Sequence, residues 1–464
     1  MLSRYRISGT PDRVHINGDV QQNVVLNADG FFRALLVLPP PRCLDLLRIA
    51  TGIFAVDRIT KRKKRRDNEH GLRQLRVVSE VRDHDFWGRP DIVDLLSAIL
   101  SFLTDDDWSF DFERAQRAPG DLGHQDFLAL PHPFPPRYAA LYSGGLDSAS
   151  GLANRLLEGA DDFLLVTVGH QSGLHRRVKN QFDGNKQNKG LKTLFSELNG
   201  VSPRILHSTL TTSLRGGKAI RMRQQEPTQR TRAFLFCSAA AIAADAYKLD
   251  VVEMFENGVG AINLPLMTGM LGNGLSTRGA HPTFLQMMSA LSTHVTRRNI
   301  RFVLPFEART RAEMLKHLAA VPGLGIWAQE SRSCVHTALR QTGKTHCGRC
   351  PACIERRQAF AVAGINEKLD VYQTNLLVDS LSDQDEADYL DLYQIDATNW
   401  VAGNASVERR MNNHFRLTDV SPDQDQRIQE LQLRHAREVL RTFGDPFSRH
   451  RNSTQVIEGY GREV

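Results

Sequence analysis

Short apolar runs recur along the middle of the chain, and a segment of helix length separates each from the next. The runs cover residues 138–142, 163–168, 204–207, 251–255 and 300–304. The segment 230–248, which is rich in Ala and Leu, is typical of a helix between two of them. Apolar strands that alternate with helices predict a parallel sheet covered by helices on both faces. We therefore expect an α/β domain over residues 137–364.

The pattern changes on both sides of this domain. Before it lie two strand-like runs, a helical piece and a polar–aromatic alternation typical of a strand, at residues 31–38, 74–81, 91–103 and 105–112. A stiff proline-rich stretch at 131–136 suits a boundary. We predict an α+β N-terminal accessory domain over residues 1–136.

The last hundred residues are helical and acidic in pattern. Ser421-Pro422 is a good cap and first-turn pair, and it opens an amphipathic segment that runs to residue 442. Residues 365–464 hold 11 Lys and Arg against 18 Asp and Glu. This pattern predicts an α-helical acidic C-terminal extension.

The chain has 464 residues, of which 41% are hydrophobic and 24% charged, as in ordinary globular proteins. Its longest apolar run, about 233–244, is shorter than the roughly 18 residues that a membrane span needs. The N-terminus has no apolar stretch typical of a secretory signal. We expect a cytoplasmic protein that does not enter a membrane.

A net charge of +7 favours a nucleic-acid or phosphate-rich partner. Residues 61–66 alone carry six positive charges, however, so the basic character is concentrated in one hexapeptide. We expect this hexapeptide on an exposed loop, and the uneven distribution makes nucleic acid an unlikely partner.

A glycine-rich turn joins the first central strand to the helix that follows it. The turn and the start of the helix read Ser143-Gly144-Gly145-Leu146-Asp147-Ser148. Glycines at such a turn let backbone N–H groups approach an anion, and the helix dipole adds attraction. No Gly-Lys-Ser/Thr follows, so this is not a Walker A loop. The motif predicts a nucleotide-pyrophosphate site, with a plain tight turn as the alternative.

Four of the six cysteines lie within twenty residues of one another: Cys334, Cys347, Cys350 and Cys353. Four thiolates complete a tetrahedral zinc site and leave no open position, so we predict a structural Zn²⁺. An iron–sulfur cluster is the alternative, because four cysteines also ligate such clusters. Cys43 and Cys237 lie in apolar surroundings and are expected to be buried.

The phosphate loop and the cysteine cluster occur in this order in the same domain, and the pairing resembles the 7-cyano-7-deazaguanine synthases, a family of PP-loop ATP pyrophosphatases. Residues 347–360, Cys-Gly-Arg-Cys-Pro-Ala-Cys-Ile-Glu-Arg-Arg-Gln-Ala-Phe, are very similar to the family's zinc tail. The resemblance covers about residues 137–364. It implies a doubly wound parallel sheet of the adenine nucleotide alpha-hydrolase (PP-loop, HUP-like) type with a zinc-binding tail. It also implies an enzyme that activates 7-carboxy-7-deazaguanine with ATP and adds ammonia.

The resemblance assigns roles to individual residues. Asp147 and Ser148 are the implied catalytic residues, and Asp147 would position the pyrophosphate or its Mg²⁺. The implied ATP contacts are Ser143, Gly144, Gly145, Leu146, Asp147, Ser148, Gly169 and Arg230. The substrate candidates are Thr277, Arg278 and His281, in a segment that loosely resembles the family's base-recognising segment, and Glu256 and Asn257, which directly follow the apolar run at 251–255. For Arg230, which opens the long helix, a solvated helix start is the alternative.

The chain is longer than an ordinary synthase and looks more like the synthase-like proteins of bacterial antiviral operons, such as the QatC component of the Qat system and the type IV CBASS relative. That branch implies transfer of the activated carboxylate to an amine of a partner protein, with the flanks as docking surfaces. A synthase that uses ammonia in queuosine biosynthesis is the first alternative. A tRNA-modifying PP-loop enzyme and a non-catalytic zinc-containing nucleic-acid binder are the others.

Overall fold

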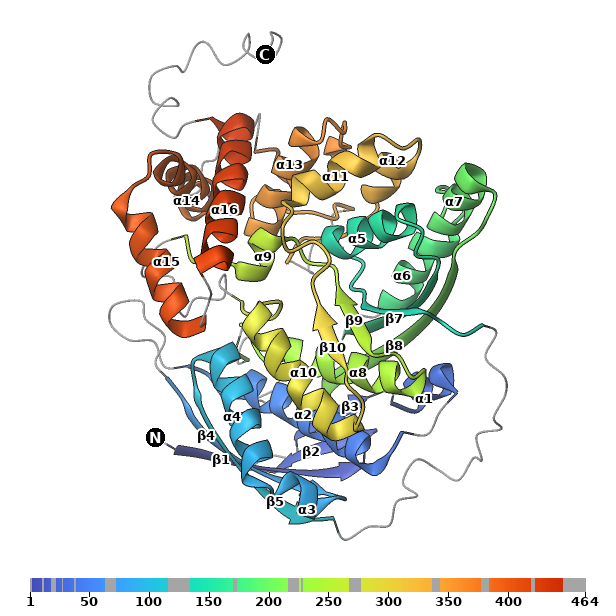
Figure 1. Ribbon diagram of the computed structural model, residues 1–464, viewed down its shortest axis with the longest axis vertical. Helices are drawn as coiled ribbons and strands as arrows, with labels where there is room; N and C mark the ends of the chain where they lie inside the picture. Colours follow the sequence, from blue (N-terminus) through green and yellow to red (C-terminus); the bar gives the residue numbers. More distant parts are fainter. Residues whose placement is uncertain are drawn as a thin grey trace. The chain divides into compact units, whose positions relative to one another are not determined.

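The structure of the chain is a computed structural model (Figure 1). It describes residues 2–10, 12–17, 22–26, 28–36, 39–62, 72–115, 134–169, 173–215, 225–226, 228–266, 277–335, 343–376, 384–418 and 422–444. The chain divides into two compact units. The first comprises Met1–Glu256, Gly260–Asn263 and Gly269–Glu307, and the second comprises Asn257–Val259, Leu264–Thr268 and Ala308–Val464. These boundaries differ from those at residues 136 and 364, and the three-domain division stays a prediction.

A large, mostly parallel sheet is the centre of the first unit. Its strand order is β10-β9-β6-β7-β8-β3-β2-β1-β4-β5. The strands are β1 (Leu2–Thr10), β2 (Arg13–Asn17), β3 (Gln22–Leu26), β4 (Gln74–Val81), β5 (Asp107–Arg114), β6 (Tyr138–Leu141), β7 (Asp162–Gly169), β8 (Arg204–Arg215), β9 (Val251–Met254) and β10 (Arg301–Val303). The α/β class and all five predicted central strands are confirmed, and β8 continues well beyond the predicted run.

The parallel half of the sheet has a topological switch at β6. Strands β7 and β8 follow β6 on one side, and the chain then crosses to place β9 on the other side of β6. Ligands of open α/β sheets bind beyond the carboxyl ends of the strands at such a point. The glycine-rich turn after β6 therefore occupies the position at which this fold binds ligands.

The sheet continues into the N-terminal part of the chain. The last residues of β8 pair antiparallel with β3, with Thr212 opposite Leu26 and Leu214 opposite Val24. Beyond β3, strands β2 and β1 pair antiparallel, and β4 and β5 run parallel to β1. One sheet thus crosses the predicted boundary at residue 136. Periodicity along a sequence does not reveal this, because it does not say which distant strands pair.

Helices cover this sheet and form most of the second unit. Those up to the loop after β9 are α1 (Ala28–Leu35), α2 (Pro41–Ile59), α3 (His84–Trp87), α4 (Pro90–Thr104), α5 (Leu146–Leu157), α6 (Leu174–Asp183), α7 (Leu191–Asn199), α8 (Arg232–Ala246) and α9 (Gly258–Ile262). Helix α8 packs on β6, β7 and β9 and on α2, which agrees with its uniformly apolar surface. Helix α10 (Pro282–Thr296) packs on α4 and α8, and Figure 1 shows it beside α4.

The N-terminal part contains one wrong prediction and one helix that was not predicted. The run at 31–38 was expected to be a strand, but residues 31–35 belong to helix α1 and Leu36 to a turn, so that prediction is wrong. Phe31, Phe32 and Leu35 are fully buried at helical spacing, a pattern that a short apolar run does not distinguish from a strand. Helix α2, which is buried from Cys43 to Asp57, was not predicted at all. The expected elements at 74–81, 91–103 and 105–112 are confirmed as β4, α4 and β5.

The second unit is helical. Its elements are α11 (Arg311–Ala319), α12 (Leu324–Ala328), α13 (Pro351–Val362), the 3₁₀ turn η5 (Leu369–Val371), α14 (Gln384–Val401), α15 (Ala405–Thr418) and α16 (Pro422–Phe443). Helix α16, which confirms the expected amphipathic helix, packs on α13 and α14. Within the described residues, no helix is both long enough and apolar enough to cross a membrane.

Candidate active site and metal centre

The phosphate loop closes on itself through its two serines. The Ser143 hydroxyl accepts a hydrogen bond from the Gly145 N–H at 3.2 Å and lies 3.2 Å from the Ser148 hydroxyl. Ser148 in turn donates to the Gly145 carbonyl at 3.0 Å. Helix α5 begins after Gly145, whose lack of a side chain leaves this helix end without a side-chain cap. The positive end of the helix dipole and the two hydroxyl groups therefore meet at this turn, as an anion site requires.

Gly144 cannot be replaced easily at this turn. Its φ is +74°, and an added Cβ would lie 3.1 Å from Val178 and 3.3 Å from the Gln181 side-chain oxygen. Gln181 also donates to the Gly144 carbonyl at 3.1 Å, while the buried Tyr142 hydroxyl donates to Gln181 at 2.7 Å. Gln181 is 5% exposed and lies on α6, the third element after the loop. Sequence reasoning missed this residue, because no local pattern links it to the glycines.

Gly169 and Glu256 lie beside the phosphate loop in the order of the sheet. Gly169 is the last residue of β7, and Glu256 follows β9, the strands on either side of β6. Carboxyl ends of adjacent parallel strands share one edge of a sheet, so these two predicted residues share the edge of the loop. Residues 170–172, which follow β7, lie outside the described residues. Asn257 is buried and belongs to the second unit.

The two predicted arginine contacts are held by the end of helix α4. Arg230 donates to the Thr104 carbonyl at 3.0 Å and lies 3.3 Å from the Asp105 carboxylate. Arg278 donates to the same carboxylate at 2.7 Å and to the Phe102 carbonyl at 2.8 Å. Arg230 is 5% exposed, so the solvated helix start that was its alternative is wrong. Burial, and then the charge of nearby Arg62, lowers the pKa of Arg230.

Two further substrate candidates have structural partners. The backbone carbonyl of Thr277 accepts a hydrogen bond from the Asn263 amide at 2.9 Å. His281 is buried at the N-cap of α10, where its Nδ1 accepts from the Thr283 N–H at 3.2 Å. Its ring also packs on Phe102. Residues 267–276, which precede Thr277, lie outside the described residues.

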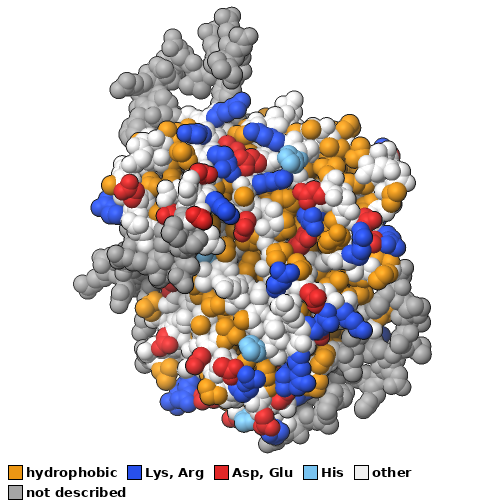
Figure 2. Space-filling model, in the orientation of Figure 1, with side chains coloured by type: hydrophobic (Ala, Val, Ile, Leu, Met, Phe, Trp, Pro, Cys, Tyr) orange, Lys and Arg blue, Asp and Glu red, His pale blue; other side chains and the backbone are white. Residues whose placement is uncertain are grey.

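Part of the basic hexapeptide is buried, contrary to the expectation of an exposed loop. Arg62 is 7% exposed and forms an ion pair with Asp106 at 2.6 Å. Arg73 pairs with the same carboxylate and with Asp57. Burial alone would raise the pKa of Asp57, but Arg73, Arg62 and the Thr231 N–H together outweigh burial and lower that pKa. Residues 63–66 lie outside the described residues. On the face drawn in Figure 2, acidic and basic side chains intermingle.

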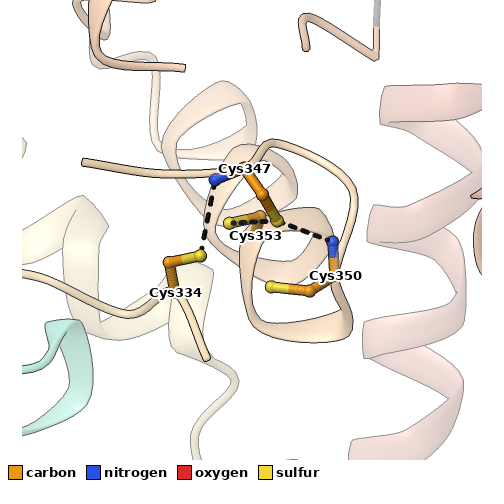
Figure 3. Close-up of side chains that lie close together, drawn as sticks. All are labelled: Cys334, Cys347, Cys350 and Cys353. Carbon is orange, nitrogen blue, oxygen red and sulfur yellow. Dashed lines mark hydrogen bonds between the residues drawn. The ribbon is translucent and has the colours of Figure 1, made fainter. Parts of the chain in front are cut away.

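The four clustered cysteines converge on one point. Their sulfur atoms all lie within 4.8 Å of one another, and the Sγ atoms of Cys347 and Cys353 are 3.9 Å apart (Figure 3). Tetrahedral zinc with Zn–S bonds of about 2.3 Å places its sulfurs about 3.8 Å apart. The residues therefore fit a four-thiolate zinc site. Hydrogen bonds among the four side chains lower the pKa of the Cys347 thiol and raise the pKa of the Cys350 and Cys353 thiols.

The local backbone supports this arrangement. Cys350 caps α13, and its N–H donates to the Cys347 sulfur at 3.3 Å, while the Cys347 N–H donates to the Cys334 sulfur at 3.4 Å. Gly348 turns the chain between them with φ of +89°. Tyr372 packs against the cluster from outside. These N–H···S bonds orient the sulfur atoms and favour thiolates, the form that binds metal.

The remaining cysteines are buried, as predicted. Cys43 and Cys237 are both 0% exposed and belong to the core of the first unit. Burial raises the pKa of Cys43 to about 12 and that of Cys237 further. Neither thiol is therefore available as a thiolate nucleophile near neutral pH.

The fold and the cysteines define a mixed α/β protein with a large, mostly parallel sheet and a cluster consistent with a zinc site. Comparison with known proteins shows which family the chain is similar to. Residues 278–364, which include all four clustered cysteines, match the family model of the queuosine biosynthesis protein QueC. The chain is thus a distant homologue of the 7-cyano-7-deazaguanine synthases, which are ATP-dependent enzymes of ligase type.

The individual relatives differ in how much they share with this chain. The chain is 25% identical over 249 residues to the 7-cyano-7-deazaguanine synthase of Saccharolobus solfataricus, covering 50% of this chain but only 47% of that protein. It is 23% identical over 246 residues to the synthase of Allorhizobium ampelinum, covering 52% of this chain and 94% of that protein. A 93-residue segment is 31% identical to 7-cyano-7-deazaguanine synthase 1 of Mesorhizobium japonicum. The antiviral-operon branch stays a prediction.

Proposed function

We propose that this protein is an ATP-dependent enzyme that adenylates a carboxylate of the 7-carboxy-7-deazaguanine type and transfers the acyl group to an amine. The observation that carries the proposal is the Ser-Gly-Gly turn at the topological switch of the sheet, in a distant homologue of the deazaguanine synthases. This turn lies at the switch point of the sheet, has a glycine backbone and leads into the N-terminus of α5. These three features together suit the binding of a nucleotide pyrophosphate.

The proposed chemistry has two steps. A carboxylate oxygen of the substrate attacks the α-phosphorus of ATP, and pyrophosphate leaves. The amine nitrogen then attacks the activated carbonyl carbon, a C–N bond forms, the amine loses a proton, and AMP departs with the former carboxylate oxygen. Activation is needed because a carboxylate is a poor electrophile and lacks a leaving group.

The residues of the loop take the phosphate roles in this proposal. The loop N–H groups and the hydroxyls of Ser143 and Ser148 hold the departing pyrophosphate, and Asp147, in the first turn of α5, positions its Mg²⁺. Gly169 and Glu256, at the neighbouring strand ends, border the same edge.

The metal centre has a separate role. A zinc ion held by Cys334, Cys347, Cys350 and Cys353 would have four protein ligands and no open position, so it would supply stability and no chemistry.

We place the acceptor amine on a partner protein. About half of this chain lies outside the segment it shares with the Allorhizobium relative, although that segment spans almost all of the relative. Additional chain beyond the synthase core favours an acceptor that needs docking over ammonia, which does not. The antiviral-operon setting rests on the sequence resemblance alone.

Product release tests the proposal. The purified protein is incubated with ATP, Mg²⁺, 7-carboxy-7-deazaguanine and hydroxylamine, a small amine that stands in for the acceptor, and AMP and pyrophosphate are quantified with and without the deazaguanine. We expect release that depends on the deazaguanine, and a loss of about 100-fold or more in Asp147→Ala. Asp161→Ala removes a carboxylate that pairs with Arg137 and should retain activity. Equal ATP turnover in the two variants would contradict the assigned role of Asp147.

The acceptor is tested separately by mass. Proteins encoded next to this chain are added to the reaction and weighed intact. A mass increase equal to the acyl group supports a protein acceptor. Free amide or nitrile with unmodified proteins would instead show that ammonia is the acceptor.

A further inference from the structure

The end of helix α4 contacts three of the residues assigned to the cleft, Arg230, Arg278 and His281. Arg230 and Arg278 both reach the Asp105 carboxylate, and each also donates to a carbonyl in the last turn of α4, those of Thr104 and Phe102. The Phe102 ring lies 5.2 Å from the Arg278 guanidinium carbon and 5.2 Å from the centre of the His281 ring. All of these residues belong to the first unit.

These contacts are well suited to hold arginines in place. The last carbonyls of a helix lack partners within the helix, and the negative end of its dipole attracts cations. Asp105 adds a formal charge at this end in a left-handed conformation, with φ of +58°. The side chains of Arg230 and Arg278 are 3% and 17% exposed, whereas that of their shared partner Asp105 is 38% exposed, so the carboxylate pairs with the two arginines at the border of the protein interior.

The topology places this cluster at the edge that the phosphate loop also occupies. Arg230 stands just before α8, which leads into β9, while Arg278 and His281 stand just before α10, which leads into β10. Both strands run parallel to β6, so a helix that precedes either of them begins at the carboxyl edge of the sheet. The end of α4 therefore lies where the cleft is expected.

We propose that the end of α4, and Asp105 above all, is the positioning element of the substrate cleft and orients Arg278 toward the deazaguanine carboxylate, together with Arg230, which this proposal moves from the expected ATP contacts to the substrate. This inference rests on the proposed function. It gives the N-terminal part of the chain a role inside the reaction, where the sequence suggested only a docking surface. Asp105 is a positioning residue, because it acts through the two arginines.

Asp105→Asn tests the proposal, because it removes the charge and keeps the size. Asp111→Asn is the matched control, since Asp111 also pairs with an arginine, Arg76, but on exposed strand residues. We expect Asp105→Asn to raise KM for the deazaguanine carboxylate about fivefold or more, to change kcat less and to leave KM for ATP near wild type. Asp105→Glu should restore part of the loss. If the KM of Asp105→Asn matches that of Asp111→Asn, the proposal is overturned.

A second measurement separates this proposal from the proposed function. Amide hydrogen exchange is followed at residues 228–231 and 277–281 in both variants. Faster exchange there in Asp105→Asn alone supports positioning, even if wild-type protein shows no turnover with the deazaguanine. Unchanged exchange at both segments would overturn positioning even in an active enzyme.

Discussion

Gly348 shows how one residue permits the metal centre. Its φ is +89°, and an added Cβ would lie 1.8 Å from the Thr374 carbonyl oxygen. The Cys-x-x-Cys spacing predicts the ligands, but the need for glycine between them comes from a segment more than twenty residues further along the chain. Backbone strain and a steric clash would act together on any substitution here.

Gly348→Ala should therefore destabilise the second unit by about 3 kcal/mol or more and lower its zinc content. Gly364→Ala is the control, since Gly364 has φ of +71° but nothing within 4 Å of an added Cβ. That variant should lose only about 1 kcal/mol from strain. Denaturant unfolding and metal analysis provide the measurements, and equal losses in the two variants would contradict the account.

His207 makes stability depend on pH. Burial, and then the charge of His175, lowers the pKa of His207 from 6.5 to about 3. The His175 ring stacks on it, and the Thr167 hydroxyl lies 2.9 Å from its Nε2. As the pH falls, His207 therefore takes up a proton near pH 6.5 in the unfolded chain but only near pH 3 in the folded chain. The stabilising contribution is complete above pH 6.5 and falls as the pH drops.

Urea unfolding at pH 7 and pH 4.5 should show this loss. We expect His207 to account for up to about 2 kcal/mol of the difference in wild-type stability between the two values. In His207→Gln this part of the difference should vanish. A pH dependence identical to that of wild type would show that His207 is not responsible.

At the scale of elements, the pattern predicted what is regular and local. The five parallel strands, α4, β4, β5 and α16 follow from periodicity, and the turn after β6 follows from its glycines. Helix α1 was mistaken for a strand because eight apolar-rich residues suit either element. Gln181 supports the phosphate loop, and the end of α4 accepts a hydrogen bond from Arg230. Both contacts depend on long-range packing, which periodicity does not encode.

The link between α6 and the phosphate loop gives a prediction for Gln181→Leu. The variant removes the hydrogen bond to the Gly144 carbonyl and leaves the Tyr142 hydroxyl without this acceptor. We expect a stability loss of about 1–3 kcal/mol and weaker ATP binding. Gln187→Leu, on an exposed turn, is the control. ATP affinity measured by calorimetry should fall in the first variant only, and equal affinities would exclude Gln181 as a support of the loop.

At the scale of the whole molecule, the continuous sheet changes the meaning of the flanks. The sequence suggested that residues 137–364 hold everything the chemistry needs. In the structure β3 pairs with β8, α2 packs on α8, and the end of α4 holds the buried Arg230 and the half-buried Arg278 of the central part. The charge pattern also gave a wrong expectation, that of an exposed basic loop, because Arg62 of the basic hexapeptide forms an ion pair with Asp106 inside the protein.

Deletion of residues 1–136 should consequently prevent folding of the first unit. The truncated chain would expose a strand edge, an apolar helix face and two unpaired guanidinium groups. We expect aggregation, or a product without a cooperative thermal transition, whereas the full chain unfolds cooperatively. A truncated protein that folds and binds ATP would contradict this view and favour the three-domain division.

The central claim is adenylation of a carboxylate at the phosphate loop, and the fate of an oxygen atom tests it most directly. The reaction is run with 7-carboxy-7-deazaguanine labelled with ¹⁸O in its carboxylate, and the products are analysed by mass spectrometry. The account predicts one ¹⁸O in the phosphate of AMP, because AMP departs with a former carboxylate oxygen. Label in orthophosphate, or AMP without label, would contradict it.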